Sequence, residues 1–324
     1  MTLQKIENGI FIQDTILDKI KKIDAIIFDC DGVLIDITKS YDLAIKEVTE
    51  YFLREFGIGN AFSITPDIIE GFKSTGGFND EVDLTYASIL SLVAANRMKT
   101  PAQKFLFDVI NNADQTGIKS VEKYITNLPV DISDITKKLD YPGPHDTNLL
   151  YSVFDQMFYG SEIYYKLFKK QSKFSGQGFI ENDVNLLKNN LVAKLKKKFK
   201  NKLTIVTGRG RESIRYTLGN LLDEFDQRNS VFLEDESRDL AKPNPQSLIK
   251  SIRGLDSACC LYVGDSMEDY IMAKKATENG YDAIFCAIFG TSKTPESKRI
   301  FFEQKNTPMI LQSIDLLPKA LNLV

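Results

Sequence analysis

The sequence predicts an α/β protein in which helices cover both faces of a doubly wound parallel sheet and a mainly helical domain is inserted after the first strand. Two features point to this fold. Short apolar runs rich in β-branched residues alternate with polar segments of helical periodicity, which is typical of such sheets. One long interval, 38 to 175, has helical periodicity but few strand-like runs. With 324 residues, of which 43% are hydrophobic, the chain is long enough for two domains.

The expected strands begin near the amino terminus and recur through the second half of the chain. In order they are DAIIFD at 24 to 29, LTIVT at 203 to 207, SVFLE at 230 to 234, LYVGD at 261 to 265, DAIFCAI at 282 to 288 and PMILQ at 308 to 312. Helical segments separate them, so neighbouring strands are expected to run parallel. SIDLLPKAL follows the last run and predicts a closing helix with Ser313 as its N-cap.

The interval between the first two strands is too long for a simple crossover. Amphipathic helices are expected in it at 41 to 56, 84 to 98 and 146 to 158. The return linker is expected in FSGQGFIEND, where Gly176 and Gly178 suit a flexible hinge. The sequence thus predicts a Rossmann-like core formed by 1 to 37 and 176 to 324, and a helical domain formed by 38 to 175.

The charge balance argues against nucleic acid or an anionic membrane as a partner. The 41 basic and 44 acidic residues leave a formal charge of -3, so no net positive field attracts a polyanion. A lysine-rich run at 194 to 202 is an apparent exception. Because Leu187, Leu191, Leu195 and Phe199 recur at helical spacing through it, we interpret it as a helix with one buried stripe and lysines on its exposed face.

The expected compartment is the cytoplasm. The amino terminus has no basic segment followed by a long apolar stretch, and no apolar run approaches the roughly 20 residues that span a bilayer. The absence of a CxxC pair favours buried reduced thiols over a metal or redox role for the cysteines, which are Cys30, Cys259, Cys260 and Cys286.

The only histidine, His145, excludes histidine-rich metal sites. A serine or cysteine triad would depend on this residue alone, and no GxSxG segment accompanies it. A loop or capping role is favoured for His145, with a substrate contact as the alternative.

The strongest chemical signal is DAIIFDCDGVLID at 24 to 36, an apolar run that ends in two aspartates and a glycine. Side chains at i and i+2 of a strand point to the same side, so Asp29 and Asp31 converge beyond the carboxyl end of the strand, where open α/β sheets bind ligands. Two adjacent carboxylates repel unless a cation or a proton intervenes. Mg²⁺ is the natural cation beside phosphate. A surface turn built on Asp-Gly is the alternative.

This segment resembles the first motif of the haloacid dehalogenase superfamily, a strand followed by DxDG. Three later segments resemble the remaining motifs of that family in order: LTIVTGRGRES at 203 to 213, AKPNPQSL at 241 to 248 and CCLYVGDSMEDY at 259 to 270. Each is a weak signal alone, but their order and their places at strand ends make the set specific. The position of the inserted domain resembles the branch of phosphoglycolate phosphatase-like proteins, whose cap lies between the first two motifs.

The resemblance implies a phosphatase that forms an aspartyl-phosphate intermediate on a small phosphorylated metabolite. Asp29 matches the nucleophile of the family and Asp31 its general acid and base, while Thr207, Gly208 and Lys242 match the groups that bind phosphate. The implied ligands of Mg²⁺ are Asp29, Asp31 through its backbone carbonyl, Asp265, and Asp269 as a supporting carboxylate.

The chain departs from the family pattern in three places. Val33 stands where threonine is often found, and Ile37 follows Asp36 where serine or threonine is usual. The change at Val33 does not touch the chemistry. The insert of about 140 residues is larger than the caps typical of this branch, so no substrate specificity is transferred from the family.

Within the inserted domain, GFKSTGGFNDEVDLT at 71 to 85 is expected to shape the substrate pocket. Gly76 and Gly77 permit a tight loop, and Lys73, Asn79 and Asp80 offer polar contacts. The alternative is a turn between helices in which Asn79 or Asp80 is the N-cap.

Two arginines follow Thr207 closely in the second motif. Arg209 and Arg211 are candidates for binding an anionic group of the substrate. The alternative is that both are solvated cations of the loop.

Two other functions stay open at this point. A phosphomutase needs the same four motifs but returns the phosphoryl group to its substrate instead of to water. A noncatalytic protein that binds phosphorylated metabolites would retain its ligand without turnover. Dehalogenation is disfavoured, because family members with that chemistry lack the second aspartate and Asp31 is present.

Overall fold

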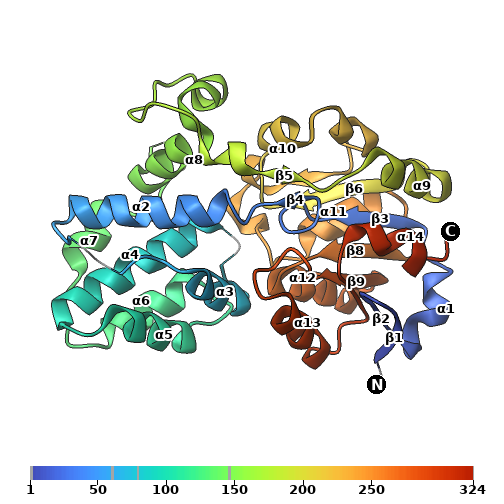
Figure 1. Cartoon of the computed structure of the whole chain (residues 1–324), viewed down its shortest axis with the longest axis horizontal. Coiled ribbons are helices and arrows are strands. Elements are labelled where there is room, and N and C mark those ends of the chain that lie inside the picture. The colour runs from blue at the N-terminus through green and yellow to red at the C-terminus, as the bar shows by residue number, and fades with distance from the viewer. Residues whose placement is uncertain (1–2, 60–61, 79, 145–146, 324) are drawn as a thin grey trace. The chain divides into compact units, whose positions relative to one another are not determined.

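The computed structural model describes residues 3–59, 62–78, 80–144 and 147–323. The chain divides into two compact units, which we call the core unit (Met1–Thr38 with Val184–Val324) and the inserted unit (Lys39–Asp183) (Figure 1). The inserted unit therefore ends later than the expected boundary at 175. The segment 174 to 183, expected to be a linker, belongs to it.

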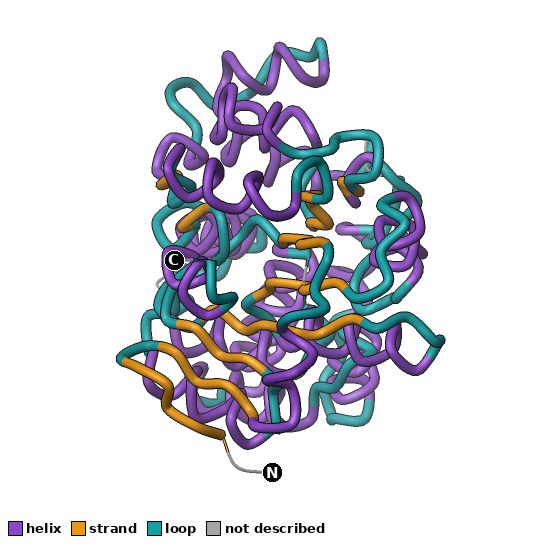
Figure 2. The backbone as a smooth tube through the Cα atoms, turned by 90° about the vertical axis from the view of Figure 1, so that its right-hand side faces the viewer, coloured by secondary structure: helices purple, strands orange, loops and turns teal. Residues whose placement is uncertain are grey.

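The core unit contains an eight-stranded sheet with the order β1-β2-β10-β9-β8-β3-β6-β7, whose strands lie side by side in Figure 2. Pairing is parallel from β10 to β7, whereas β2 is antiparallel to both β10 and β1. This mostly parallel sheet confirms the predicted α/β fold class. The strands are β1 (Leu3–Glu7), β2 (Ile10–Gln13), β3 (Ala25–Phe28), β6 (Leu203–Thr207), β7 (Val231–Phe232), β8 (Cys260–Gly264), β9 (Ala283–Ile288) and β10 (Met309–Leu311).

Helices pack on both faces of this sheet. Its buried side chains form a cluster with three helices, in which Ile27 and Tyr262 contribute from the strands and Leu248 and Met272 from the helices. In Figure 1, α9 and α10 lie above the strands, and α12 and α13 lie below them. The helices of the core unit are α1 (Leu17–Ile20), α9 (Asn189–Phe199), α10 (Arg211–Leu218), α11 (Gln246–Gly254), α12 (Met267–Glu278), α13 (Pro295–Gln304) and α14 (Leu317–Ala320).

The lysine-rich run forms α9 as predicted. Leu191, Leu195 and Phe199 are buried, and Lys194 and Lys197 are exposed. The four cysteines are unpaired and buried, which confirms the prediction of buried thiols. Within the described residues, no helix is both long enough and apolar enough to cross a bilayer.

Two local predictions need correction, and one hairpin was missed. The amino-terminal hairpin β1-β2 was not expected, because Lys5 and Glu7 interrupt its apolar pattern at an exposed sheet edge. The run expected as a strand at 230 to 234 bends into a 3-10 turn, Leu233–Asp235. Ser313 precedes a short 3-10 turn, and its side chain makes no capping hydrogen bond.

A small two-stranded sheet pairs the segment of the core unit that precedes the insert with the segment that follows it. It pairs β4 (Ile35–Asp36) with β5 (Val184–Asn185) in antiparallel register. Both strands belong to the core unit, so the first motif is linked by hydrogen bonds to the segment that follows the insert.

The inserted unit is helical. Its central helix, α4, is buried along most of its length, including Leu84, Ile89 and Val93. An all-round apolar helix of this kind suits the middle of a bundle. The helices are α2 (Tyr41–Glu55), α3 (Pro66–Ser74), α4 (Glu81–Met98), α5 (Ala102–Asn112), α6 (Ile118–Thr126), α7 (Ser133–Leu139) and α8 (Leu149–Phe168).

The helix expected at 146 to 158 begins instead at Leu149, after Asn148, whose side chain accepts hydrogen bonds from the first turn. His145 and Asp146 lie outside the described residues. The helix breaks at Gly160, where φ is 72°. A Cβ on Gly178 would lie 2.2 Å from the carbonyl carbon of Tyr159. Gly178 thus permits close backbone packing, which differs from the flexible hinge that we expected there.

Candidate active site

The first motif forms a tight loop directly after β3. Asp29 follows the last strand residue, and its backbone amide donates to the carbonyl of Val263 on the neighbouring strand β8 (2.8 Å). Gly32 has a φ of +70°, and a Cβ at this position would lie 2.2 Å from Oδ2 of Asp265. Only glycine allows both this conformation and this approach. The loop therefore lies against the end of β8.

The fourth motif is fixed by a capping box at the start of α12. Ser266 Oγ accepts from the backbone amide of Asp269 (3.2 Å). Asp269 Oδ2 accepts from the amides of Asp265 and Ser266 and from Ser266 Oγ. Its other oxygen, Oδ1, accepts from Tyr262 Oη (2.7 Å) and pairs with the ammonium of Lys242 (2.7 Å). Asp269 is thus occupied by donors that orient the loop carrying Asp265.

Lys242 from the third motif links two of the carboxylates. Its Nζ lies 2.9 Å from Asp29 Oδ1 and 2.7 Å from Asp269 Oδ1, and its side chain is fully buried. Burial by itself lowers the pKa of Lys242, but Asp269 and Asp29 outweigh it and hold that pKa above its ordinary value. The ammonium therefore stays charged within this group of carboxylates.

The pKa values of the two aspartates that Lys242 contacts are shifted in opposite directions. Burial raises the pKa of Asp29 well above its ordinary value, with Lys242 opposing the rise and Asp269, Asp31 and Asp265 adding to it. Burial also acts on Asp269, yet Lys242 and the hydrogen bonds from Tyr262 and Ser266 hold its pKa below the ordinary value. A cation beside Asp29 would oppose this rise and favour the carboxylate form.

An acidic cluster results at the carboxyl ends of the neighbouring strands β3 and β8. Carboxylate oxygens of Asp29, Asp265 and Asp269 lie within 4.8 Å of one another. Asp31 is not part of this cluster. Its Oδ1 lies 2.8 Å from Nε of Arg209, whose side chain is 1% exposed.

The second motif ends β6, the neighbour of β3 on its other side. Thr207 is fully buried at the end of the strand, and the amide of Arg209 approaches its hydroxyl (3.4 Å). Beyond it, carboxylates of Glu234 and Asp235 accept from the amides of Gly210 and Arg211. These bonds link the turn after β6 to the 3-10 turn that follows β7.

The two arginines of this motif behave differently. The interpretation as a solvated cation is wrong for Arg209, which is buried and paired with Asp31. It holds for Arg211, which is exposed, donates to Gln227 (3.2 Å) and lies over the ring of Phe232.

Two contacts from the segment after β9 were not predicted. Thr291 Oγ1 donates to the carbonyl of Gly32 (2.6 Å). Lys298, on α13, places its Nζ 2.7 Å from Oδ2 of Asp265. No sequence motif pointed to either residue, because a lysine on an amphipathic helix is ordinarily exposed.

In the inserted unit, the segment expected to shape a pocket makes structural contacts. Lys73 pairs with Glu81 (3.0 Å). Gly76 has a φ of +79°, and a Cβ on Gly77 would lie 2.5 Å from the carbonyl oxygen of Asp114. Asp80 is the N-cap of α4, the alternative that we had left open. Asn79 lies outside the described residues. A substrate role for this segment stays a prediction.

Two substitutions of Asp80 distinguish helix capping from a substrate contact. Its Oδ1 accepts from the amide of Val82 (2.8 Å), and its Oδ2 from Tyr151 Oη (3.1 Å). Asp80→Ala is therefore expected to lower the free energy of unfolding by about 0.5–2 kcal/mol through loss of the cap. Asp80→Asn keeps a capping oxygen and serves as the control. An altered ester preference in Asp80→Asn would support a substrate contact, and unchanged stability in Asp80→Ala would contradict the capping account.

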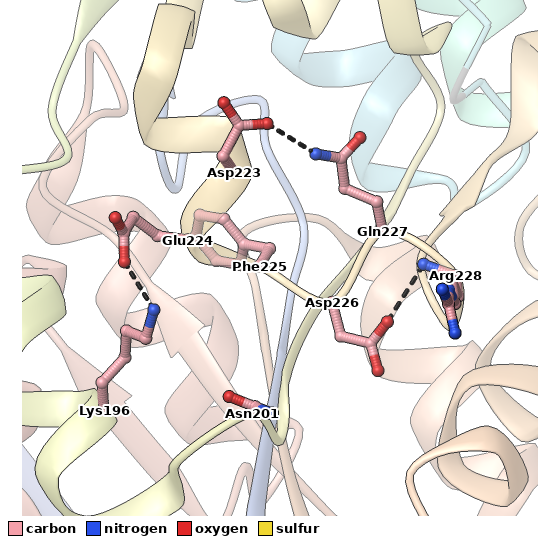
Figure 3. Close-up of a pocket in the computed structure, with 8 residues that line it drawn as sticks. All are labelled: Lys196, Asn201, Asp223, Glu224, Phe225, Asp226, Gln227 and Arg228. Atoms are coloured by element: carbon pink, nitrogen blue, oxygen red, sulfur yellow. Dashed lines mark hydrogen bonds and ion pairs between the residues drawn. The ribbon is translucent and has the colours of Figure 1, made fainter.

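A separate open cleft of about 440 Å³ lies near the amino ends of β6 and β7 (Figure 3). Its polar side chains contact one another: Lys196 forms an ion pair with Glu224 (2.6 Å), and the Gln227 amide donates to Asp223 (2.9 Å). β6 begins at Leu203 and ends at Thr207, so this cleft lies at the strand end opposite the acidic cluster. We assign it no part in the chemistry.

Comparison with known proteins agrees with the geometry. The family model of haloacid dehalogenase-like hydrolases matches residues 23–277. Among solved structures, the phosphatase Tt82 from Thermococcus thioreducens is 24% identical, with a TM-score of 0.54, and the match covers 83% of this chain and 94% of that one. A family IA, variant 3 hydrolase from Entamoeba histolytica is 16% identical, with a TM-score of 0.46 and coverage of 93% and 99%. No curated protein matches the sequence significantly.

Proposed function

Because the chain belongs to the haloacid dehalogenase-like hydrolases, we propose that it is a Mg²⁺-dependent phosphatase that hydrolyses a small phosphate monoester through an aspartyl-phosphate on Asp29. The observation that carries the proposal is the convergence of Asp29, Asp265 and Lys242 at the carboxyl ends of β3 and β8. Phosphoryl transfer needs a nucleophile in line, a cation and fixed donors for the phosphoryl oxygens, and this group supplies candidates for each.

The residues present fit a magnesium ion. The cluster offers carboxylate oxygens from three aspartates as ligand atoms, and hard divalent cations prefer such oxygens. The ammonium groups of Lys242 and Lys298 lie beside them. Burial raises the pKa of Asp29, with the neighbouring carboxylates adding to the rise, and a cation nearby would favour its charged form. Asp29, Asp265 and the backbone carbonyl of Asp31 would hold the ion, while Asp269, already occupied by donors, orients them. When bound, the ion would share the charge of the phosphoryl group.

Each of the other groups at the site has a separate role in the proposed reaction. Asp29 attacks phosphorus and breaks the bond to the ester oxygen, with Lys242 and the Thr207 hydroxyl as donors to phosphoryl oxygens, together with the backbone at Gly208. Asp31 gives a proton to the leaving alkoxide and then takes one from the water that hydrolyses the acyl phosphate. Arg209 forms an ion pair with Asp31 (2.8 Å), which orients that carboxyl group.

The cation requirement is tested by phosphate release from a panel of phosphorylated metabolites. Turnover is expected with Mg²⁺, to be lost in excess chelator and to return when Mg²⁺ is added back. Asp265→Asn removes one charged ligand and is expected to raise the Mg²⁺ concentration needed for half-maximal rate by at least about 10-fold, since loss of a mere outer-shell partner already costs that much, while the fold is retained. Undiminished turnover in excess chelator would contradict the proposal.

A phosphomutase is the second candidate, because it requires the same group of residues. The same panel distinguishes the two: a phosphatase releases inorganic phosphate, whereas a mutase yields an isomeric phosphate ester. The cytoplasmic location and the preference for a small metabolite over nucleic acid or membrane stay predictions.

A further inference from the structure

The segment after β9 contributes to the acidic cluster from outside the four motifs. Gly290 is held to the end of β10, since its amide donates to the carbonyl of Gln312 (2.9 Å). Thr291 Oγ1 then donates to the carbonyl of Gly32, in the loop of the first motif (2.6 Å). α13 begins at Pro295, and one turn later Lys298 reaches Asp265. The segment is thus attached to the loops of both the first and the fourth motif.

Lys298 contacts Asp265, the proposed metal ligand of the fourth motif. Its Nζ lies 2.7 Å from Asp265 Oδ2, and the two side chains are only 10% and 20% exposed. A pair this sheltered is weakly screened by salt. The contact joins residues far apart in sequence, and the segment that precedes its helix is attached through Gly290 and Thr291.

The ammonium group of Lys298 reduces the net negative charge that a cation meets at Asp265. Lys242 is shared between Asp29 and Asp269, whereas Lys298 pairs with Asp265. A divalent cation on Asp265 must share that carboxylate with an ammonium group only a few ångströms away. Like charges at that separation repel appreciably even in a high-dielectric site, and an anionic phosphate beside the cation would offset the repulsion.

We propose that Lys298 is a positioning residue that holds Asp265 in the metal-free protein and weakens the binding of free Mg²⁺, so that tight binding of the cation requires phosphate at the site. The inference rests on the proposed function, because it takes Asp265 as a ligand of Mg²⁺. Its effect concerns metal affinity and is therefore measurable without turnover.

The experiment is calorimetric titration of Mg²⁺ into the full chain, with and without inorganic phosphate. Lys298→Met removes the charge and keeps the length of the side chain. It is expected to tighten binding of Mg²⁺ at least about tenfold in the absence of phosphate and to reduce the gain that phosphate brings. Lys298→Arg keeps the charge and is expected to bind as the wild type does. Lys298→Gln replaces Lys298→Met if the latter does not fold.

Lys250→Met is the matched control, because it removes one lysine charge from an ion pair elsewhere in the core unit, with Glu236 at 2.8 Å. It is expected to leave the affinity unchanged. Equal or weaker Mg²⁺ binding in Lys298→Met than in the wild type would overturn the inference and leave the proposed function standing. Absence of Mg²⁺ binding in every protein, with and without phosphate, would overturn both.

Discussion

Asp29→Asn is expected to reduce turnover by about 10⁴ or more, to the background rate. An amide oxygen is a far weaker nucleophile than a carboxylate, and no other side chain of the cluster stands at the end of β3. Removing a member of a reacting group typically costs several orders of magnitude. The measurement is the steady-state rate with an aryl phosphate and Mg²⁺, at protein concentrations high enough to detect residual activity.

The loss must be separated from unfolding. Asp29 is a buried partner of Lys242, which keeps its second partner Asp269 in the variant. Because loss of one partner of a buried pair destabilises a fold, thermal denaturation of Asp29→Asn accompanies the kinetics. Asp282→Asn, which alters an exposed pair with Lys19 (3.0 Å), is the control for a generic Asp-to-Asn change and should keep full activity. Substantial turnover in folded Asp29→Asn would rule out Asp29 as the nucleophile.

Asp31→Asn is expected to slow hydrolysis of the aspartyl-phosphate more than its formation. The variant keeps the nucleophile and the backbone carbonyl but lacks the proton shuttle, a loss of typically about 10² to 10⁴ in rate. An aryl leaving group departs with little protonation, so formation of the intermediate should survive while hydrolysis slows. Rapid mixing should therefore give a burst of aryl alcohol close to one equivalent per active site, followed by slow steady-state release.

The partner of Asp31 requires a control in this experiment. Arg209 is almost fully buried and pairs with the Asp31 carboxylate, and loss of one partner of a buried pair destabilises a fold. Thermal denaturation of Asp31→Asn therefore accompanies the kinetics. If folded Asp31→Asn protein releases aryl alcohol slowly and without a burst, the role of Asp31 in the second half of the reaction is contradicted.

Much of the core could be predicted because its signals are local. The run at 203 to 207 is observed as β6 without any change of boundary, since every residue in it is buried on both faces of the sheet. The pairing of Asp29 with Lys242 joins residues far apart in sequence, yet it followed from the family's order of motifs.

Contacts without a local pattern could not be predicted. Lys298 reaches Asp265 only because the segment after β9 is attached to Gly32 and to the end of β10, which depends on how distant segments pack. Arg209 is buried because Asp31 lies opposite it, and a lone arginine in a loop is more often exposed. For Asp80, capping and substrate binding call for the same residue type, so the sequence alone could not reveal the bond from the Val82 amide.

The most direct test of the account is the location of the phosphoryl group in the intermediate. Asp31→Asn protein is mixed with an aryl phosphate and Mg²⁺, quenched in acid within the burst, digested and analysed by mass spectrometry. The account predicts one phosphate on the peptide that contains Asp29, on that side chain, and none in a parallel sample with chelator. Phosphate found reproducibly on a different residue, or a full burst with no covalent phosphate on the chain, would contradict it.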